Sequence, residues 1–152
     1  MKVRAIIILL IAATGYLACS KNDMSKIPTI ALMSFVPDIM KVNFDTCVIK
    51  FSLADGDGDI GNDTTSEIYL RDSRYDTAGF VKIPFPAIDP TIEDPQKGLQ
   101  GTCTFSPVLQ PTPRLDSFHM ALGDTLTYEF YIKDRAGHQS NHITTHPLII
   151  RP

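Results

Sequence analysis

The chain has 152 residues, of which 14 are basic and 17 are acidic, and its formal net charge is −3. Proteins that bind nucleic acid carry clustered lysine and arginine in excess, so this balance excludes a nucleic-acid partner. The length suits one domain with a single hydrophobic core.

The first 18 residues have the pattern of a secretory signal peptide. Lys2 and Arg4 precede an apolar run of about ten residues, which is too short to span a bilayer as a stable helix. Cys19 follows directly, and this arrangement resembles the start of bacterial lipoproteins, whose first mature residue is a lipidated cysteine. The resemblance implies cleavage after residue 18 and a lipidated tether over residues 19–26. The alternative is a cleaved signal with Cys19 lost or free.

The residues that follow Cys19 bear on location. The sequence "SKND" resembles the short signals that send such lipoproteins to the outer surface of the cell. We therefore expect a protein that is anchored to the outer membrane by its lipid. The sequence does not decide between the periplasmic face and the cell surface. Acyl chains on Cys19 would anchor the protein stably because each buried methylene contributes about 0.8 kcal/mol.

Short runs of alternating apolar and polar residues recur between turn signals, which predicts an all-β fold. The expected strands are residues 27–37, 46–53, 66–72, 79–85, 99–109, 124–134 and 142–152. Two proline-rich connections, residues 83–95 and 106–118, interrupt them, and we expect loops or edge strands there because proline cannot serve a central ladder.

Two of these runs alternate most regularly. In one, Cys47, Ile49, Phe51 and Leu53 are predicted to share one face of the strand, opposite the polar residues between them. In the other, Leu126, Tyr128, Phe130 and Ile132 are predicted to share one face in the same manner.

Cys47 and Cys103 both lie in strand-like contexts. An exported protein can form a disulfide between them, which would contribute on the order of 4 kcal/mol in the chain-entropy model. The alternative is two separately buried thiols.

About seven strands in residues 27–152 fit an immunoglobulin-like (Ig-like) antiparallel β-sandwich. The stretch "DTLTYEF" resembles strand F of immunoglobulin domains, with Tyr128 at the tyrosine-corner position and Phe130 in place of the usual cysteine. The stretch "DRAGHQSN" resembles a turn of bacterial Ig-like domains. With "DGDGDIG" and the lipoprotein-like start, the chain resembles small Ig-like lipoproteins of Bacteroidetes type. This resemblance implies a fold and a location, and no established activity.

The stretch "SLADGDGDIGND", residues 52–63, is a candidate metal site. It is not an EF-hand, because counting from Asp55 places Ile60 where that loop needs glycine and Ser66 where it needs glutamate. If the run that ends at Leu53 is strand B, this stretch is the B–C loop, and if the run that ends at Lys133 is strand F, Asp134 begins the F–G loop. In an Ig-like sandwich these two loops lie at the same end. The residues expected to hold one Ca²⁺ ion there are Asp55, Asp57, Asp59, Asn62 and Asp134. The alternative is a solvated turn, in which Asp and Gly are the usual residues.

No nucleophile motif and no glycine-rich phosphate loop occurs in the sequence, so we expect no enzyme. The function we expect is a lipid-anchored interaction or structural module of the cell envelope, with an unknown partner. The alternative is a ligand-binding lipoprotein that handles a glycan. The aromatic side chains that could line its surface are Tyr69, Tyr75, Phe80, Phe85 and Tyr131, although the chain lacks the tryptophan on which such surfaces usually rely.

Overall fold

The computed structural model describes residues 24–61, 66–94, 98–107, 115 and 119–152. The expectations for the signal peptide, Cys19 and Asn62 fall outside these residues. The strands are β1 (Thr29–Val36), β2 (Ile39–Lys41), β3 (Val48–Asp55), β4 (Glu67–Asp72), β5 (Val81–Pro84), β6 (Ile88–Asp94), β7 (Gly98–Phe105), β8 (Asp124–Leu126), β9 (Tyr128–Lys133), β10 (Ile143–Thr144) and β11 (Leu148–Arg151). A short 3-10 helix, Ser73–Ala78, joins β4 to β5. No helix in the described ranges is long and apolar enough to cross a membrane.

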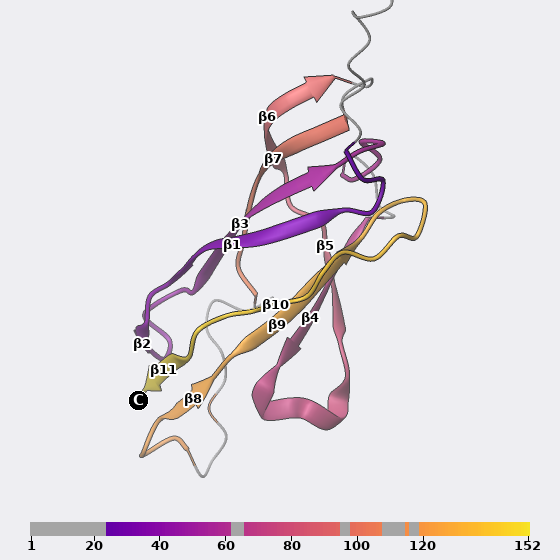
Figure 1. Ribbon diagram of the computed structural model, residues 1–152. Coiled ribbons are helices and arrows are strands. Elements are labelled where there is room, and N and C mark those ends of the chain that lie inside the picture. Colours follow the sequence, from indigo (N-terminus) through magenta and orange to yellow (C-terminus); the bar gives the residue numbers. More distant parts are fainter. Residues whose placement is uncertain (1–23, 62–65, 95–97, 108–114, 116–118) are drawn as a thin grey trace, which may run out of the picture.

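The strands form an all-β sandwich, as the sequence predicts (Figure 1). One sheet has the order β1-β3-β7-β6 and the other has the order β10-β9-β4-β5, and all pairs within both are antiparallel. A three-stranded sheet, β2-β11-β8, lies at the end of the molecule that holds the C-terminus. The strand order is compatible with an Ig-like domain, and the Ig-like assignment itself stays a prediction.

The core lies between the two larger sheets and consists of the side chains that alternation predicts. Every second residue of β3 and of β9 is buried. Phe51 lies at the centre, where its ring makes edge contacts with Phe85, Phe105 and Phe130. Phe130 stands where the strand that β9 resembles in immunoglobulin domains has a cysteine. It therefore makes apolar contacts there in place of a disulfide. Burying each such ring contributes about 1.5–3 kcal/mol.

Tyr128 is also buried, with its ring against Phe35. No hydrogen bond from its hydroxyl to a backbone group is formed among the residues that the structure describes, and the thiol of Cys47 is its polar neighbour. The hydrogen bond that defines a tyrosine corner is therefore not formed there, although Tyr128 occupies the inward position that the resemblance implies.

The structure has more strands than the seven expected. The run over residues 124–134 is divided at Thr127, because Leu126 pairs with β11 whereas Tyr128 pairs with β4. β6 lies within the proline-rich residues 83–95 as an edge strand, with a register shift between Pro90 and Ile92. An edge position tolerates proline because one side of the strand needs no ladder bonds.

The possible disulfide between Cys47 and Cys103 is not formed, and both are buried free thiols. Cys103 pairs with Phe51 across the β3–β7 ladder. Cys47 stands four residues before Phe51, about 13 Å along an extended chain. A disulfide needs Cα atoms about 4.4–6.8 Å apart, so the strand register separates the two sulfur atoms.

Candidate metal centre

Asp55 is placed by the alternation of β3. The inward series of this strand is Ile49, Phe51, Leu53 and Asp55, so the last inward position holds a carboxylate instead of an apolar side chain. Asp55 is 0% exposed. The same rule acts on β9 in the opposite sheet, because Asp134 directly follows β9 at the next inward position after Ile132 and its side chain is 0% exposed. Both sheets therefore direct a buried carboxylate to the same end of the core.

Residues 55–60, which we call the acidic turn, bring two more carboxylates to this point. Gly58 has a φ of 66°, a left-handed conformation that glycine adopts without strain. The chain therefore curls back, and the backbone N–H of Asp59 donates to Oδ2 of Asp55 at 3.0 Å. Ile60 is buried in the core and fixes the far end of the turn. Asp57 is exposed at the tip.

Asp134 is held by the turn that follows it. The backbone N–H of His138 donates to its Oδ1 at 2.7 Å, and Nδ1 of His138 lies 2.8 Å from its Oδ2. The backbone N–H of Ala136 donates to Oδ2 of Asp59 at 3.0 Å. This turn therefore fixes its own carboxylate and also holds one from the acidic turn.

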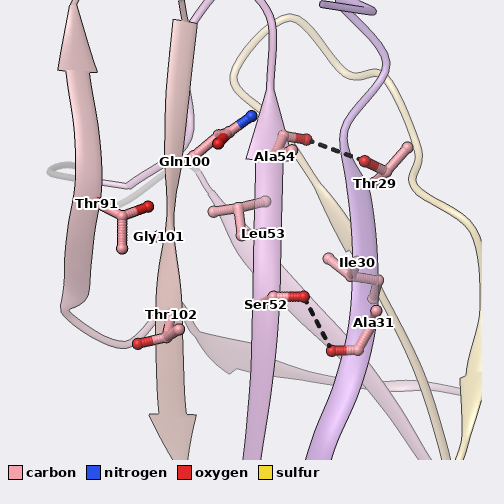
Figure 2. Close-up of a pocket in the computed structure, with 10 residues that line it drawn as sticks. All are labelled: Thr29, Ile30, Ala31, Ser52, Leu53, Ala54, Thr91, Gln100, Gly101 and Thr102. Carbon is pink, nitrogen blue, oxygen red and sulfur yellow. Dashed lines mark hydrogen bonds between the residues drawn. The ribbon is translucent and has the colours of Figure 1, made fainter.

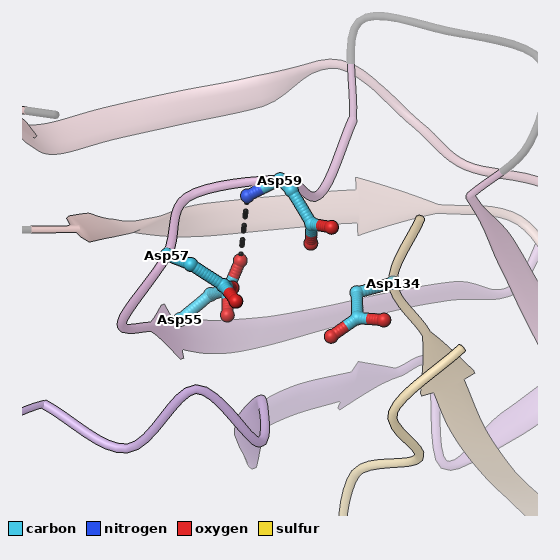
Figure 3. A group of neighbouring side chains, drawn as sticks. All are labelled: Asp55, Asp57, Asp59 and Asp134. Atoms are coloured by element: carbon cyan, nitrogen blue, oxygen red, sulfur yellow. Dashed lines mark hydrogen bonds between the residues drawn. The ribbon is translucent and has the colours of Figure 1, made fainter. Parts of the chain in front are cut away.

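The four aspartates form one cluster (Figure 3). One oxygen from each of Asp55, Asp57, Asp59 and Asp134 lies within 4.8 Å of the others. Oδ1 of Asp55 and Oδ1 of Asp59 are both buried, and no donor in the described part of the chain reaches either atom. Two buried oxygens in this cluster thus lack the partner that a buried polar atom normally has.

The cluster disfavours ionisation of its own members. Burial, followed by the charge of Asp57, raises the pKa of Asp55 from 3.8 to about 7. Burial, followed by the charge of Asp134, also raises the pKa of Asp59. Carboxylates that repel one another in a partly buried site are stabilised when a cation enters.

Carboxylate oxygens are the ligands that hard cations such as Ca²⁺ and Mg²⁺ take in proteins. One oxygen from each of the four aspartates lies within 4.8 Å of the others, so the cluster can hold a metal ion, and its geometry does not select one cation.

The structure thus brings together four of the five residues that the sequence singled out as metal ligands, and Asn62 lies outside the described residues. The sequence did not reveal the support that His138 and Ala136 give the cluster. The i,i+4 spacing of Asp134 and His138 was the available signal, and it acquires meaning only once the turn is known.

The aromatic residues considered for glycan binding are arranged differently. Phe85 is partly buried and packs against Phe51 at the edge of the core, so much of its ring is covered. Tyr69 and Tyr131 stack with 4.8 Å between ring centres and 5° between planes, and His142 stacks on Tyr131 at 4.6 Å. Both faces of the Tyr131 ring are therefore occupied by neighbouring rings, whereas a sugar would need a free face.

An open pocket of about 490 Å³ lies on the outer face of the first sheet (Figure 2). Its lining consists mostly of small side chains from adjacent strands and includes no charged residue; examples are Ala31, Ser52, Ala54, Gly101 and Thr102. Such a lining offers few hydrogen-bonding groups and no charge with which to orient a ligand, so we assign this pocket no ligand.

Comparison of the chain with protein-family models, with curated proteins and with solved structures finds no match. The function proposed below therefore rests on the residues of this chain and their geometry.

Proposed function

We propose that this protein is a non-enzymatic, lipid-anchored module of the cell envelope that binds one Ca²⁺ ion between the acidic turn and the turn after β9. The observation that carries the proposal is the fully buried Asp55, which belongs to the four-aspartate cluster and whose Oδ1 has no hydrogen-bond partner among the described residues.

Burial distinguishes this proposal from the alternative of a solvated turn. In a turn that serves only solubility, the aspartates would face water, and Asp57 alone does so fully. Asp55 and Asp134 occupy core-facing positions instead. A buried carboxylate without a cation or a donor is costly, whereas a bound cation converts the same arrangement into a favourable one.

The place where β1 begins bears on the orientation that a lipid anchor would impose. β1 pairs with β3 so that its first residue, Thr29, lies opposite Ala54 beside the acidic turn. A lipid on Cys19 would therefore hold the metal end of the sandwich toward the membrane and direct the C-terminal end away from it. The protein from host membranes is expected to begin at Cys19 and to carry an added lipid mass, which mass spectrometry of the intact chain measures. A mature chain that begins elsewhere, or that carries no lipid, contradicts the anchor.

Isothermal titration of the purified protein in detergent tests the metal site. We expect one Ca²⁺ to bind with measurable heat. Saturation should also raise the melting temperature, because binding at 100 times Kd adds about 2.7 kcal/mol to the free energy of unfolding. The absence of both heat and a melting shift at millimolar Ca²⁺ would refute the site.

The glycan-binding alternative has less support. Tyr75 is 51% exposed, but the guanidinium of Arg74 lies over its ring at 5.3 Å, and the other surface rings stack on one another. A glycan array with the purified protein tests this alternative, and binding that is lost on changing Tyr75 or Tyr131 would favour it.

A further inference from the structure

The segment that leads into β1 rests on the acidic turn. The backbone N–H of Gly56 donates to the carbonyl oxygen of Ser25 at 2.8 Å. Nε2 of Gln100, on β7, donates to Sδ of Met24 at 3.0 Å. Figure 1 shows this start of the described chain, in indigo, beside the end of β3. Ser25 is thus attached to the domain through the same turn that carries three of the four aspartates, and Met24 through the neighbouring strand β7.

This contact is a close backbone approach. A Cβ atom at Gly56 would lie 2.3 Å from the carbonyl oxygen of Met24 and 2.6 Å from that of Ser25. A Cβ atom at Gly98 would lie 2.3 Å from the carbonyl oxygen of Asp55. The N-terminal segment, the acidic turn and the start of β7 therefore pack backbone against backbone. A displacement of the turn must change the backbone contacts that hold Met24 and Ser25.

The position of Gly56 depends in turn on the carboxylates. Asp55 precedes Gly56 directly, and Asp57 follows it. Without a cation the charges of the cluster repel one another, which favours a more open turn. A bound cation draws Asp55, Asp57 and Asp59 toward Asp134 and so holds the Gly56 N–H in the position from which it reaches Ser25.

We propose that the metal site is also a clasp for the N-terminal segment, so that an occupied site holds Met24 and Ser25 on the domain and a vacant site releases them. The inference rests on the proposed function, because it needs the cation. Met24 stands five positions after Cys19, and an extended chain of that length spans at most about 17 Å. The clasp would therefore decide how closely the domain stands to its anchor.

Hydrogen exchange measured residue by residue by NMR tests the clasp, with the full chain in detergent micelles. The reporting amides are those of Gly56, which bonds Ser25, and Ile27, whose N–H donates to Oγ of Ser25 at 3.0 Å. We expect exchange at both amides to slow by about tenfold or more when Ca²⁺ replaces a chelator, because the local opening becomes rarer.

Two variants separate the clasp from the metal site. Gln100→Ala removes the side chain that bonds Met24 and lies outside the acidic turn, so Ca²⁺ should still bind while the calcium effect on Ile27 weakens. Asp57→Asn removes an exposed ligand and touches neither Met24 nor Ser25, so both amides should exchange at the calcium-free rate. Asp89→Asn, which changes an exposed aspartate on β6, is the matched control and should behave as the unaltered protein does.

The two proposals fail in different ways. If titration shows no Ca²⁺ binding, the proposed function is wrong and the clasp falls with it. If Ca²⁺ binds and the Gly56 and Ile27 amides exchange at the same rates with and without it, the clasp alone is overturned. An Asp57→Asn protein that keeps the calcium-dependent slowing while its Ca²⁺ affinity is lost also overturns the clasp.

Discussion

The backbone N–H of Ala136 donates a hydrogen bond to Oδ2 of Asp59, 3.0 Å away, although the two residues are 77 positions apart in the chain. This bond joins the turn after β9 to the acidic turn after β3. It also orients Asp59 toward Asp134, since both turns leave the core at the same end of the sandwich (Figure 3). The candidate metal centre therefore depends on how the two sheets pack against each other as much as on its own residues.

Removing a single carboxylate should weaken calcium binding. Asp134→Asn keeps the acceptor for the His138 N–H but removes one charge, and Asp57→Asn removes a charge at an exposed position. Because the charge of the ligands tunes calcium affinity, each change should raise Kd by about tenfold or more in isothermal titration. Asp89→Asn controls for the loss of any surface aspartate and should leave Kd unchanged. Titrations of both cluster variants that match that control would argue against these ligands.

The cation-free protein should lose stability as pH rises. The pKa of Asp55 is about 7 in the folded state and 3.8 in the unfolded reference, so the folded state binds the extra proton between these values. Stability then falls as pH increases through this window, at about 1.4 kcal/mol for each unit of pKa difference. Denaturant unfolding at pH 5 and at pH 8, after dialysis against a chelator, measures this decrease.

Two comparisons make this pH dependence specific to Asp55. Asp55→Asn should flatten the decrease between pH 5 and pH 8, because the titrating group is gone. Saturating Ca²⁺ should abolish it in the unaltered protein, since the ion keeps the carboxylate ionised. A cation-free protein that is more stable at pH 8 than at pH 5 would show that the carboxylates are not forced together.

The aromatic centre of the core should dominate stability. Phe51 is 0% exposed and contacts three other rings, so Phe51→Ala should lower the free energy of unfolding by about 3–5 kcal/mol. Phe44 is 77% exposed, and the same substitution there should change it by about 0.5 kcal/mol or less. Urea unfolding measures both. Equal losses at the two positions would mean that the core is not centred on Phe51.

The two core cysteines should be unreactive in the native protein. Burial raises the pKa of Cys47 to about 11 and that of Cys103 to about 12, so neither is a thiolate at pH 8. In a Cys19→Ser background, a thiol reagent should modify both residues in denaturant and neither in the folded protein. A reductant should leave the melting temperature unchanged, and a melting temperature that drops with reductant would reveal a disulfide.

The strands whose side chains alternate regularly could be predicted from the sequence, because alternation depends only on neighbouring residues. Period-two alternation identified β3 and β9 and the side chains that each buries, because successive residues of a strand face opposite sides of the sheet. It did not resolve β2, which has only three residues, or the separation of β8 from β9, because that boundary arises from which neighbour each strand pairs with.

The pairing of the cysteines and the assembly of the aspartate cluster depend on contacts between residues far apart in the chain, so the sequence left both of them open. Whether Cys47 and Cys103 meet depends on the register of β3 against β7, which no local pattern records. Whether Asp134 joins Asp55 depends on two sheets packing so that their inward positions end at the same place. The sequence left Asp55 open between a metal ligand and a solvated turn residue, and the fold favours the ligand because it buries Asp55 at the end of an apolar series and brings three other carboxylates to it.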